Sequence, residues 1–368
     1  MSSIKGSIKF NNQSEKEFYN ELRRRVDQYF IQNNISRYAN GKMIFKSVVI
    51  FTLYFAPYIL LLTVPMVWYM QGLMWALMGL GLAGIGMSIM HDANHEAYSS
   101  KKWINKLLGY SLNLVGGSVF NWRHQHNIMH HTYTNVVDYD EDIDDKLILR
   151  MSPHNEVKKV HRFQYLYAFM FYGIITLYWA FLKDFIQFRK HIVKGVNPQS
   201  AAKNRITLFR IILAKIFYFS YVLVLPYYIA PVAFSAWILG FLLMHVIAGM
   251  VLTIIFQLAH TVEGTQHPLP AVGGTMENNW AVHQLCTTVD FARENKLLSF
   301  YIGGLNFQVE HHLFPKICHI HYPQLAPIVQ QTAREYGIPY LYNSTFGAAL
   351  SSHIRTLRRF GWPEMELM

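Results

Sequence analysis

The sequence is poor in charged residues and in cysteine. Of its 368 residues, 15% are charged and 52% are hydrophobic, and the only cysteines are Cys286 and Cys318. Two cysteines this far apart form no metal-binding pattern and do not indicate a disulfide framework. The first 40 residues are polar, with "ELRRR" where a signal peptide would need an apolar core. We therefore expect no cleaved signal peptide.

Charge is missing from two long stretches. Residues 47–90 contain no Asp, Glu, Lys, Arg or His, and residues 216–259 contain only His245. A helix needs about 20 apolar residues to cross a bilayer, so each stretch is long enough for two spans and a tight turn. Prolines, which favour turns, mark the expected turns. They are Pro65, Pro226 and Pro231. The pattern predicts an integral membrane protein.

We expect an all-α fold with four transmembrane helices in two hairpins and a cytoplasmic helical cap that carries the functional site. A membrane domain at 44–330 should lie between an N-terminal cytoplasmic segment, 1–43, and a C-terminal cytoplasmic tail, 331–368. The four spans are predicted at about 44–64, 67–90, 208–230 and 235–258. Residues 163–182 are also uncharged and long enough to span. Their many aromatic residues suit the headgroup region, so we place them in the interface.

The net charge of +11 does not indicate a nucleic-acid partner, because no basic and aromatic binding module is visible. Lys and Arg instead collect on the cytoplasmic side of membrane proteins. Nine of them lie between positions 5 and 46, while both expected outer turns carry none. We expect the N-terminus, the region 91–207 and the C-terminus to share the cytoplasmic side.

The histidines are the residues whose spacing most clearly indicates a functional site. Each uncharged stretch ends directly at a histidine, and clusters occur in "HDANH", "HNIMHH" and "QVEHH". Residues three or four apart share a face of a helix. Adjacent residues point about 100° apart at ~3.6 residues per turn, so an adjacent pair can serve two neighbouring metals. The eight candidate ligands are His91, His95, His126, His130, His131, His260, His311 and His312.

Eight imidazoles exceed the four ligands of a structural zinc site. Imidazole suits Zn, Cu, Fe or Ni, and the absence of thiolate clusters argues against copper(I) and iron–sulfur sites. The Glu-x-x-His pairs of soluble di-iron bundles are also absent. The pattern predicts a two-metal site at the membrane surface without naming the metal. Further candidates, as metal ligands or as partners of the ligand histidines, are Gln308, Gln257, Asn94, Asp92, His283 and Asn306. The acidic run 138–145 is expected to be a solvated loop.

The three clusters, in this order around two apolar hairpins, resemble the histidine boxes of the integral-membrane fatty acid desaturases. The resemblance covers roughly residues 45–325. The third box begins with glutamine and so resembles the front-end branch, which inserts a cis double bond between an existing one and the carboxyl end. The resemblance implies a non-haem di-iron centre, O₂ as co-substrate and an acyl chain, on a phospholipid or CoA, in an internal tunnel. It implies no catalytic residue beyond the metal ligands. His260, in "FQLAH", matches a ligand that the family places after its last span.

Many front-end relatives carry a fused b-type cytochrome domain with a His-Pro-Gly-Gly motif. The chain contains no such motif, and segment 1–43 is too short for the domain. The resemblance then implies a separate electron donor, either a b-type cytochrome or a ferredoxin with its reductase. One alternative is a di-iron lipid hydroxylase of the same superfamily. A second is a metal transporter, but transporters place their sites near the midplane, often with inverted repeats, whereas these histidines lie at the ends of the predicted spans.

Overall fold

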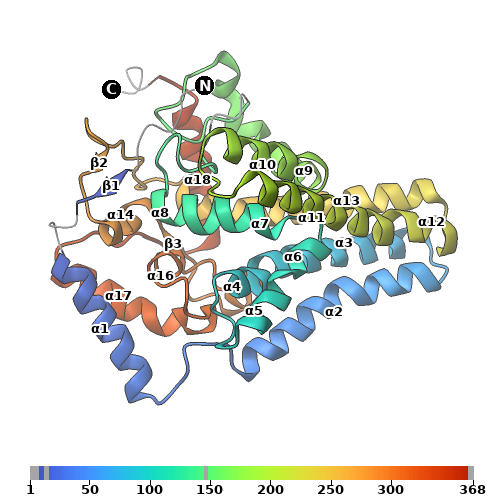
Figure 1. The fold of residues 1–368 in the computed structure, drawn as a ribbon, viewed down its shortest axis with the longest axis horizontal. Helices are drawn as coiled ribbons and strands as arrows, with labels where there is room; N and C mark the ends of the chain where they lie inside the picture. Colours follow the sequence, from blue (N-terminus) through green and yellow to red (C-terminus); the bar gives the residue numbers. More distant parts are fainter. Residues whose placement is uncertain (1–7, 12–15, 145–147, 364–368) are drawn as a thin grey trace. The chain divides into compact units, whose positions relative to one another are not determined.

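The computed structural model describes residues 8–11, 16–144 and 148–363 (Figure 1). These residues are mostly helical, as the sequence predicts, and include four strands of two residues each. They form two compact units. The first unit consists of the described residues within 1–39, 125–168 and 255–368, and the second unit of residues 40–124 and 169–254.

The first predicted hairpin belongs to the second unit. It consists of α2 (Gly41–Thr63) and α3 (Trp68–Gly84), and α3 continues through the π-helix η1 (Ile85–Ile89) into α4 (Met90–Asn94). Asn40 caps α2 by accepting hydrogen bonds from the N–H groups of the first turn. A Cβ on Gly81 would lie 2.7 Å from the backbone nitrogen of Tyr54, so glycine permits the close packing of α2 and α3. The turn at Pro65 is confirmed.

The second hairpin begins with α11 (Ala201–Phe219), the π-helix η5 (Ser220–Val224) and α12 (Leu225–Ile229), and returns through α13 (Phe234–His260). Pro231 lies in the turn, as predicted. The prediction of a turn at Pro226 is wrong, because this proline lies in the first turn of α12. The π-helix interrupts the regular hydrogen-bond ladder immediately before it, so the missing N–H of proline costs little there.

Five helical stretches are long and apolar enough to cross a membrane. Four of them overlap the four predicted spans. The fifth, Lys159–Val193, contains the segment 163–182 that the sequence analysis places in the interface. It consists of η3 (Lys159–Phe163), α9 (Gln164–Tyr178), η4 (Trp179–Lys183) and α10 (Asp184–Val193). Length and composition therefore allow one more span than the sequence predicts.

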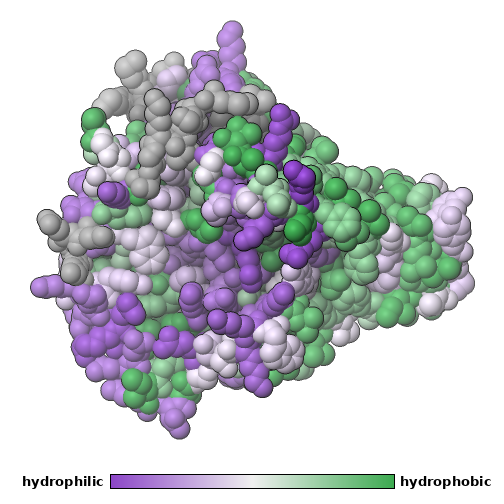
Figure 2. All heavy atoms as spheres, viewed as in Figure 1, coloured by the Kyte–Doolittle hydropathy of each residue, from purple (hydrophilic) through white to green (hydrophobic). Residues whose placement is uncertain are grey.

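Large apolar side chains cover the outside of the second unit. Figure 2 shows hydrophobic residues gathered over α2, α3, α12 and α13. Among the most exposed are Phe45, Trp68, Tyr69, Tyr228 and Leu239. Monomeric soluble proteins rarely expose a contiguous apolar surface of this kind. The surface is consistent with helices that face lipid.

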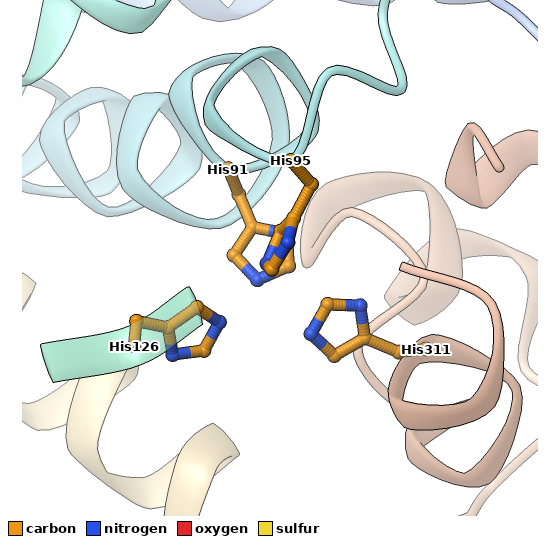
Figure 3. Close-up of side chains that lie close together, drawn as sticks. All are labelled: His91, His95, His126 and His311. Carbon is orange, nitrogen blue, oxygen red and sulfur yellow. The ribbon is translucent and has the colours of Figure 1, made fainter. Parts of the chain in front are cut away.

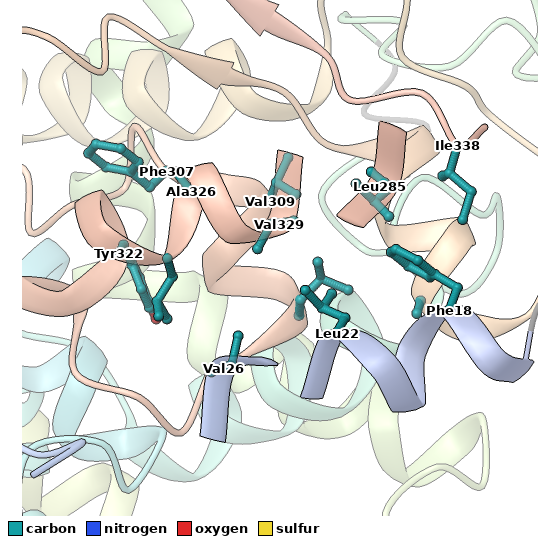
Figure 4. Close-up of a cluster of buried hydrophobic side chains, with 14 of the residues drawn as sticks. Phe18, Leu22, Val26, Leu285, Phe307, Val309, Tyr322, Ala326, Val329 and Ile338 are labelled. Carbon is teal, nitrogen blue, oxygen red and sulfur yellow. The ribbon is translucent and has the colours of Figure 1, made fainter. Parts of the chain in front are cut away.

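The core of the first unit is built around α1 (Lys16–Gln32) and α17 (Tyr322–Glu335), which lie side by side (Figure 1). Phe18, Leu22 and Val26 follow each other at intervals of four residues on one face of α1 and are fully buried (Figure 4). They pack in one cluster with side chains from α14 (Trp280–Thr287), α16 (Gln308–Leu313) and α17. This cluster fixes the position of α16, which carries the third histidine cluster.

Two short parallel strand pairs join distant segments within the first unit. β1 (Lys9–Phe10) pairs with β2 (Thr275–Met276), and β3 (Asp290–Phe291) pairs with β4 (Tyr342–Asn343). The segment that the sequence analysis separates as a tail thus contributes β4, and α18 (Phe346–Phe360) follows it. The remaining helices are α5 (Lys102–Gly109), α6 (Ser111–Leu114), α7 (Val119–Trp122), η2 (Arg123–His130), α8 (His131–Tyr133), α15 (Lys296–Tyr301) and η6 (His319–His321).

Candidate metal centre

The second histidine cluster lies on η2, a π-helix that continues into α8. A π-helix has a wider turn, with hydrogen bonds from residue i to i+5, so residues five apart come close to one face. The Nε2 atoms of His126 and His131 lie 3.2 Å apart. The ring centroids of His126 and His130 are 5.2 Å apart. The ideal α-helix assumed from the sequence would turn His131 away from His130, but in the structure all three imidazoles converge.

The third cluster lies on α16, all six residues of which are buried. The turn before it contains two glycines with left-handed backbone, Gly303 and Gly304. A Cβ on Gly304 would lie only 3.0 Å from the Cβ of His319, so this turn requires glycine. The rings of His311 and His312 are steeply inclined to each other, at 83°. The two ring planes are therefore nearly perpendicular, although both rings lie close to His131.

Two groups of three histidines form within the first unit. One nitrogen from each of His130, His260 and His312 lies within 4.8 Å of the others, and the same holds for His131, His311 and His312. All five side chains are buried. The two groups share His312, so they form one continuous cluster. Because each histidine offers one ligand atom, His312 can serve only one of the two groups at a time, and the other group then keeps two histidines.

The other three predicted ligands are also buried. His126 stacks against His311 within the first unit, with ring centroids 5.9 Å apart (Figure 3). His91 and His95 belong to the second unit, where their centroids lie 4.8 Å apart and both rings project from the same side of their helix (Figure 3). Both rings pack against Trp122. The spacing of four residues thus brings this pair together, as predicted.

The opposite ring nitrogen of four ligand candidates, Nδ1, is hydrogen-bonded. Its partners are Asp140 for His130 (3.1 Å), Gln284 for His312 (2.8 Å), the Tyr322 hydroxyl for His311 (3.3 Å) and the Thr287 carbonyl for His260 (3.3 Å). A carboxylate, an amide oxygen and a carbonyl only accept, so Nδ1 of His130, His312 and His260 is the donor. This tautomer leaves Nε2 available to a metal.

The Nε2 atoms of His130 and His260 are buried and have no hydrogen-bond partner among the described residues. Buried polar atoms are rarely left without a partner unless an ion or a water serves them. Both atoms belong to ligand sets made of imidazole, which suits iron and other transition metals. The residues present therefore fit a metal site.

The acidic run 138–145 is only in part the solvated loop that the sequence predicts, because Asp138 is exposed whereas Glu141, Asp142 and Asp144 are half-buried. Asp140 is fully buried. Besides His130 Nδ1, it accepts hydrogen bonds from the backbone N–H groups of Asn135 (2.9 Å) and Asp142 (3.1 Å). The run supplies a hydrogen-bonding partner to a ligand histidine, which offsets the cost of burying the carboxylate. Asp145, the last residue of the run, lies outside the described residues.

His130 and Asp140 shift each other's pKa values. Burial would lower the pKa of His130, but the neighbouring carboxylate raises it above its usual value. Burial would likewise raise the pKa of Asp140, but His130 and the two backbone donors hold it below its usual value. Asp140 therefore remains a carboxylate, and it would make His130 a more basic ligand for a metal.

Three of the further candidates lie on helices of the first unit. Gln308 is buried on α16, and its Nε2 has no partner among the described residues. Gln257, one turn before His260 on α13, accepts a hydrogen bond from Thr261 (2.7 Å). His283 is buried on α14 against Phe10, and burial lowers its pKa to about 4.

The remaining three candidates differ in their surroundings. Asp92 lies 3.9 Å from Nδ1 of His91. Asn94 donates to the carbonyl of Gly109 (3.2 Å) and accepts from Arg123 (2.9 Å), which ties the first cluster to the helices that follow it. Asn306 donates to Ser299 (2.8 Å) and to the carbonyl of Ala292 (3.3 Å). These bonds of Asn306 support the loop before α16 and do not reach a histidine.

The sequence pattern did not predict Asp140, Gln284 and Tyr322 as hydrogen-bond partners of the candidate ligand histidines. Gln284 is 28 residues from His312 along the chain, so no helical spacing connects them. Asp140 and Tyr322 each follow a histidine cluster by about ten residues. A buried aspartate in an acidic run has no distinctive sequence pattern. Of the three, only Tyr322 could have been predicted from the sequence. It is a tyrosine shortly after the third cluster, and a buried tyrosine hydroxyl usually has a hydrogen-bond partner.

Glu310 lies between the third-cluster residues but does not bond to a ligand histidine. Its carboxyl accepts from the Tyr340 hydroxyl (2.9 Å), which also lies 2.6 Å from Asp290. Asp290 in turn accepts from the backbone N–H of Val309 in the first turn of α16 (3.0 Å). Burial and the neighbouring Asp290 raise the pKa of Glu310 well above its usual value. The hydrogen bonds of Glu310, Tyr340 and Asp290 therefore connect the first turn of α16 to β3.

Comparisons with known proteins agree on one family. The family model described as "Fatty acid desaturase" matches residues 66–344. The chain is 35% identical to the "Acyl-lipid (8-3)-desaturase" of Physcomitrium patens over 99% of this chain and 75% of the relative. It is also 35% identical to the "sn-1 linoleoyl-lipid 6-desaturase" of Synechocystis sp. over 96% of this chain and 98% of the relative. With the "Acyl-lipid (8-3)-desaturase" of Mortierella alpina it shares 30% identity over 94% and 78% of the two chains.

Proposed function

Because the chain belongs to the fatty acid desaturase family, we propose that it is an O₂-dependent desaturase that inserts a cis double bond into an acyl chain of a membrane lipid. The names of the relatives describe desaturases of acyl chains in lipids, which supports a lipid-linked substrate over a CoA thioester. Glutamine at the first position of "QVEHH" supports a front-end position for the new double bond.

The buried pair of histidine groups that share His312 is the observation that carries this proposal. Desaturation takes two hydrogens from neighbouring methylenes and reduces O₂ to two waters, with two electrons from a donor and two protons. Two bound irons would supply the activation of O₂. We propose that the six candidate ligand histidines of the first unit bind them together with His91 and His95, which the sequence pattern assigns to the same centre.

The protein residues contribute position and protection from water. Acceptors at Nδ1 hold the imidazoles of His130, His260 and His312 in the tautomer that a metal requires. The ligand histidines are buried, which keeps bulk water from the site. Position matters strongly, because a displacement of about 1 Å can cost ~10²-fold in rate.

We propose that four of the five candidate helices span the membrane and that Lys159–Val193 lies along the cytoplasmic interface. A span through this segment would put the region 91–131 and the region 260–312 on opposite sides of the membrane. Both regions carry ligands of the proposed centre, so they must share one side. The centre would then face the cytoplasm, where a b-type cytochrome, or a ferredoxin with its reductase, could deliver electrons.

The proposal is tested by expressing the chain in a host that lacks polyunsaturated lipids and locating new double bonds by mass spectrometry. The purified protein should contain about two irons per chain. His131→Ala and His312→Ala should each lose iron and abolish the product, whereas His154→Ala, an exposed histidine of the first unit, should leave both unchanged. A hydroxylated product would favour the related hydroxylase, and zinc as the only metal of active protein would refute the oxidative mechanism.

A further inference from the structure

Asn135 has an unusual place in the loop that follows the second histidine cluster. Its side chain is fully buried, and its backbone is left-handed, with φ at 59°. Among residues with a side chain, asparagine is one of the few that adopt this conformation readily. The left-handed turn explains the backbone of Asn135 but not the burial of its side chain, which depends on the contacts that the side chain makes.

The side-chain amide of Asn135 links three segments of the first unit. Its Nδ2 lies 3.0 Å from the carbonyl of His260, 3.1 Å from that of Gln266 and 3.4 Å from that of Thr287. The NH₂ group has two hydrogens, so it is fully used by these three acceptors. It therefore joins the end of α13, the loop after it and the end of α14.

Asn135 also contacts the groups that orient two ligand histidines. Its backbone N–H donates to the same carboxylate oxygen, Asp140 Oδ2, that accepts from Nδ1 of His130. Its Nδ2 bonds to the same carbonyl, that of Thr287, that accepts from Nδ1 of His260. One residue thus holds both acceptors in place.

We infer that Asn135 is a positioning residue of the metal centre, which aligns His130 and His260 so that their Nε2 atoms meet one metal ion. The inference rests on the proposed function, because it assumes that these histidines bind a metal. The buried and unpartnered Nε2 atoms of both histidines support it independently of any activity. Asn135 would not contact the metal itself. It would act by positioning the hydrogen-bond acceptors of His130 and His260.

The decisive variant is Asn135→Gly, because glycine keeps the left-handed backbone and removes only the amide. Asn135→Asp keeps a side chain of the same shape but directs a carboxylate at three carbonyl oxygens. The full-length protein, purified in detergent and freed of metal, is titrated with Co²⁺ alone. The measurements are the affinity for each ion and the visible spectrum of the bound cobalt. We expect wild type to bind two ions, and both variants to lose about 10-fold in affinity for one of them with an altered spectrum.

Asn34→Gly is the matched control, because Asn34 is also left-handed but exposed, at the end of α1. It should bind both ions as wild type does. If wild type bound no ion, the proposed function would fail. If wild type bound two and both Asn135 variants kept the same affinities and spectrum, the positioning role would be wrong while the proposed function stood. A lower melting temperature with unchanged cobalt binding would also overturn it.

Discussion

The side-chain oxygen of Gln284 on α14 lies 2.8 Å from Nδ1 of His312 on α16. The same oxygen accepts a hydrogen bond from the hydroxyl of Thr134, 2.9 Å away. His312 is the histidine common to both groups of three. A single amide therefore fixes the tautomer of the histidine that the two groups share.

Removing this acceptor should weaken metal binding. We expect Gln284→Ala to lower the affinity for metal by about 10-fold or more, because His312 loses the partner that holds its ring. Gln284→Glu keeps an acceptor at the same place and should retain most of the affinity. Iron content after dialysis against a chelator of graded strength measures the effect. Gln32→Ala, at an exposed position on α1, is the control. Equal iron retention in all four proteins would contradict the role of Gln284.

Gln308 offers a test of the third cluster. Its buried amide lies on the same short helix as His311 and His312, and we propose that its side chain reaches a metal or a water bound to it. We expect Gln308→Ala to lose most of the activity while the fold persists. Gln308→His should keep iron and recover part of the activity, and Gln308→Glu should do worse because it adds a charge. Product yield, iron content and circular dichroism are the measurements. Normal turnover in Gln308→Ala would place the residue outside the site.

Membrane topology distinguishes four spans from five. Cysteines introduced at the exposed residues Lys102 and Lys316 should react with an impermeant reagent from the cytoplasmic face only. Cysteines at Val67 and Ala233, in the turns of the two hairpins, should react from the opposite face. This is expected because the regions 91–131 and 260–312 both carry proposed ligands and must therefore lie on the same side of the membrane. Labelling of Lys102 and Lys316 from opposite faces would show that Lys159–Val193 spans, and the single-centre proposal would then fail.

Acid should destabilise the first unit. His353 is buried on α18, its Nδ1 lies 2.7 Å from the Thr261 carbonyl, and burial lowers its pKa to about 4. The unfolded chain, with a histidine pKa of about 6.5, binds this proton more readily than the folded one. The stability from a neutral His353 is thus complete above pH ~6.5 and is lost as the pH falls toward 4, by about 3 kcal/mol at ~1.4 kcal/mol per pKa unit.

Thermal melting of the metal-free protein between pH 7.5 and 4.5 measures this loss. His353→Gln cannot take up the proton, so its melting temperature should fall less steeply over the same range. His154→Gln, at an exposed position, should follow wild type. A variant at His353 with the same pH dependence as wild type would show that this histidine does not titrate on unfolding.

Composition and spacing were enough to predict the two helical hairpins and the candidate ligands. Uncharged stretches long enough for two spans each predict the hairpins of α2 with α3 and of α11 to α12 with α13, because lipid tolerates few charges. Spacing on a helix brings His91 and His95 together. These features are local, so periodicity and composition are enough to predict them.

The residues that orient those candidate ligands depend instead on how distant segments pack together. Asp140 looked like part of a solvated acidic run, yet it is buried against His130. The π-helix η2, which turns His131 toward His126, has no sequence pattern that distinguishes it from an α-helix. Contacts such as Gln284 with His312 join residues far apart in the chain. Their formation depends on how the helices pack, because a buried ring nitrogen must find its partner in whichever segment the fold places beside it.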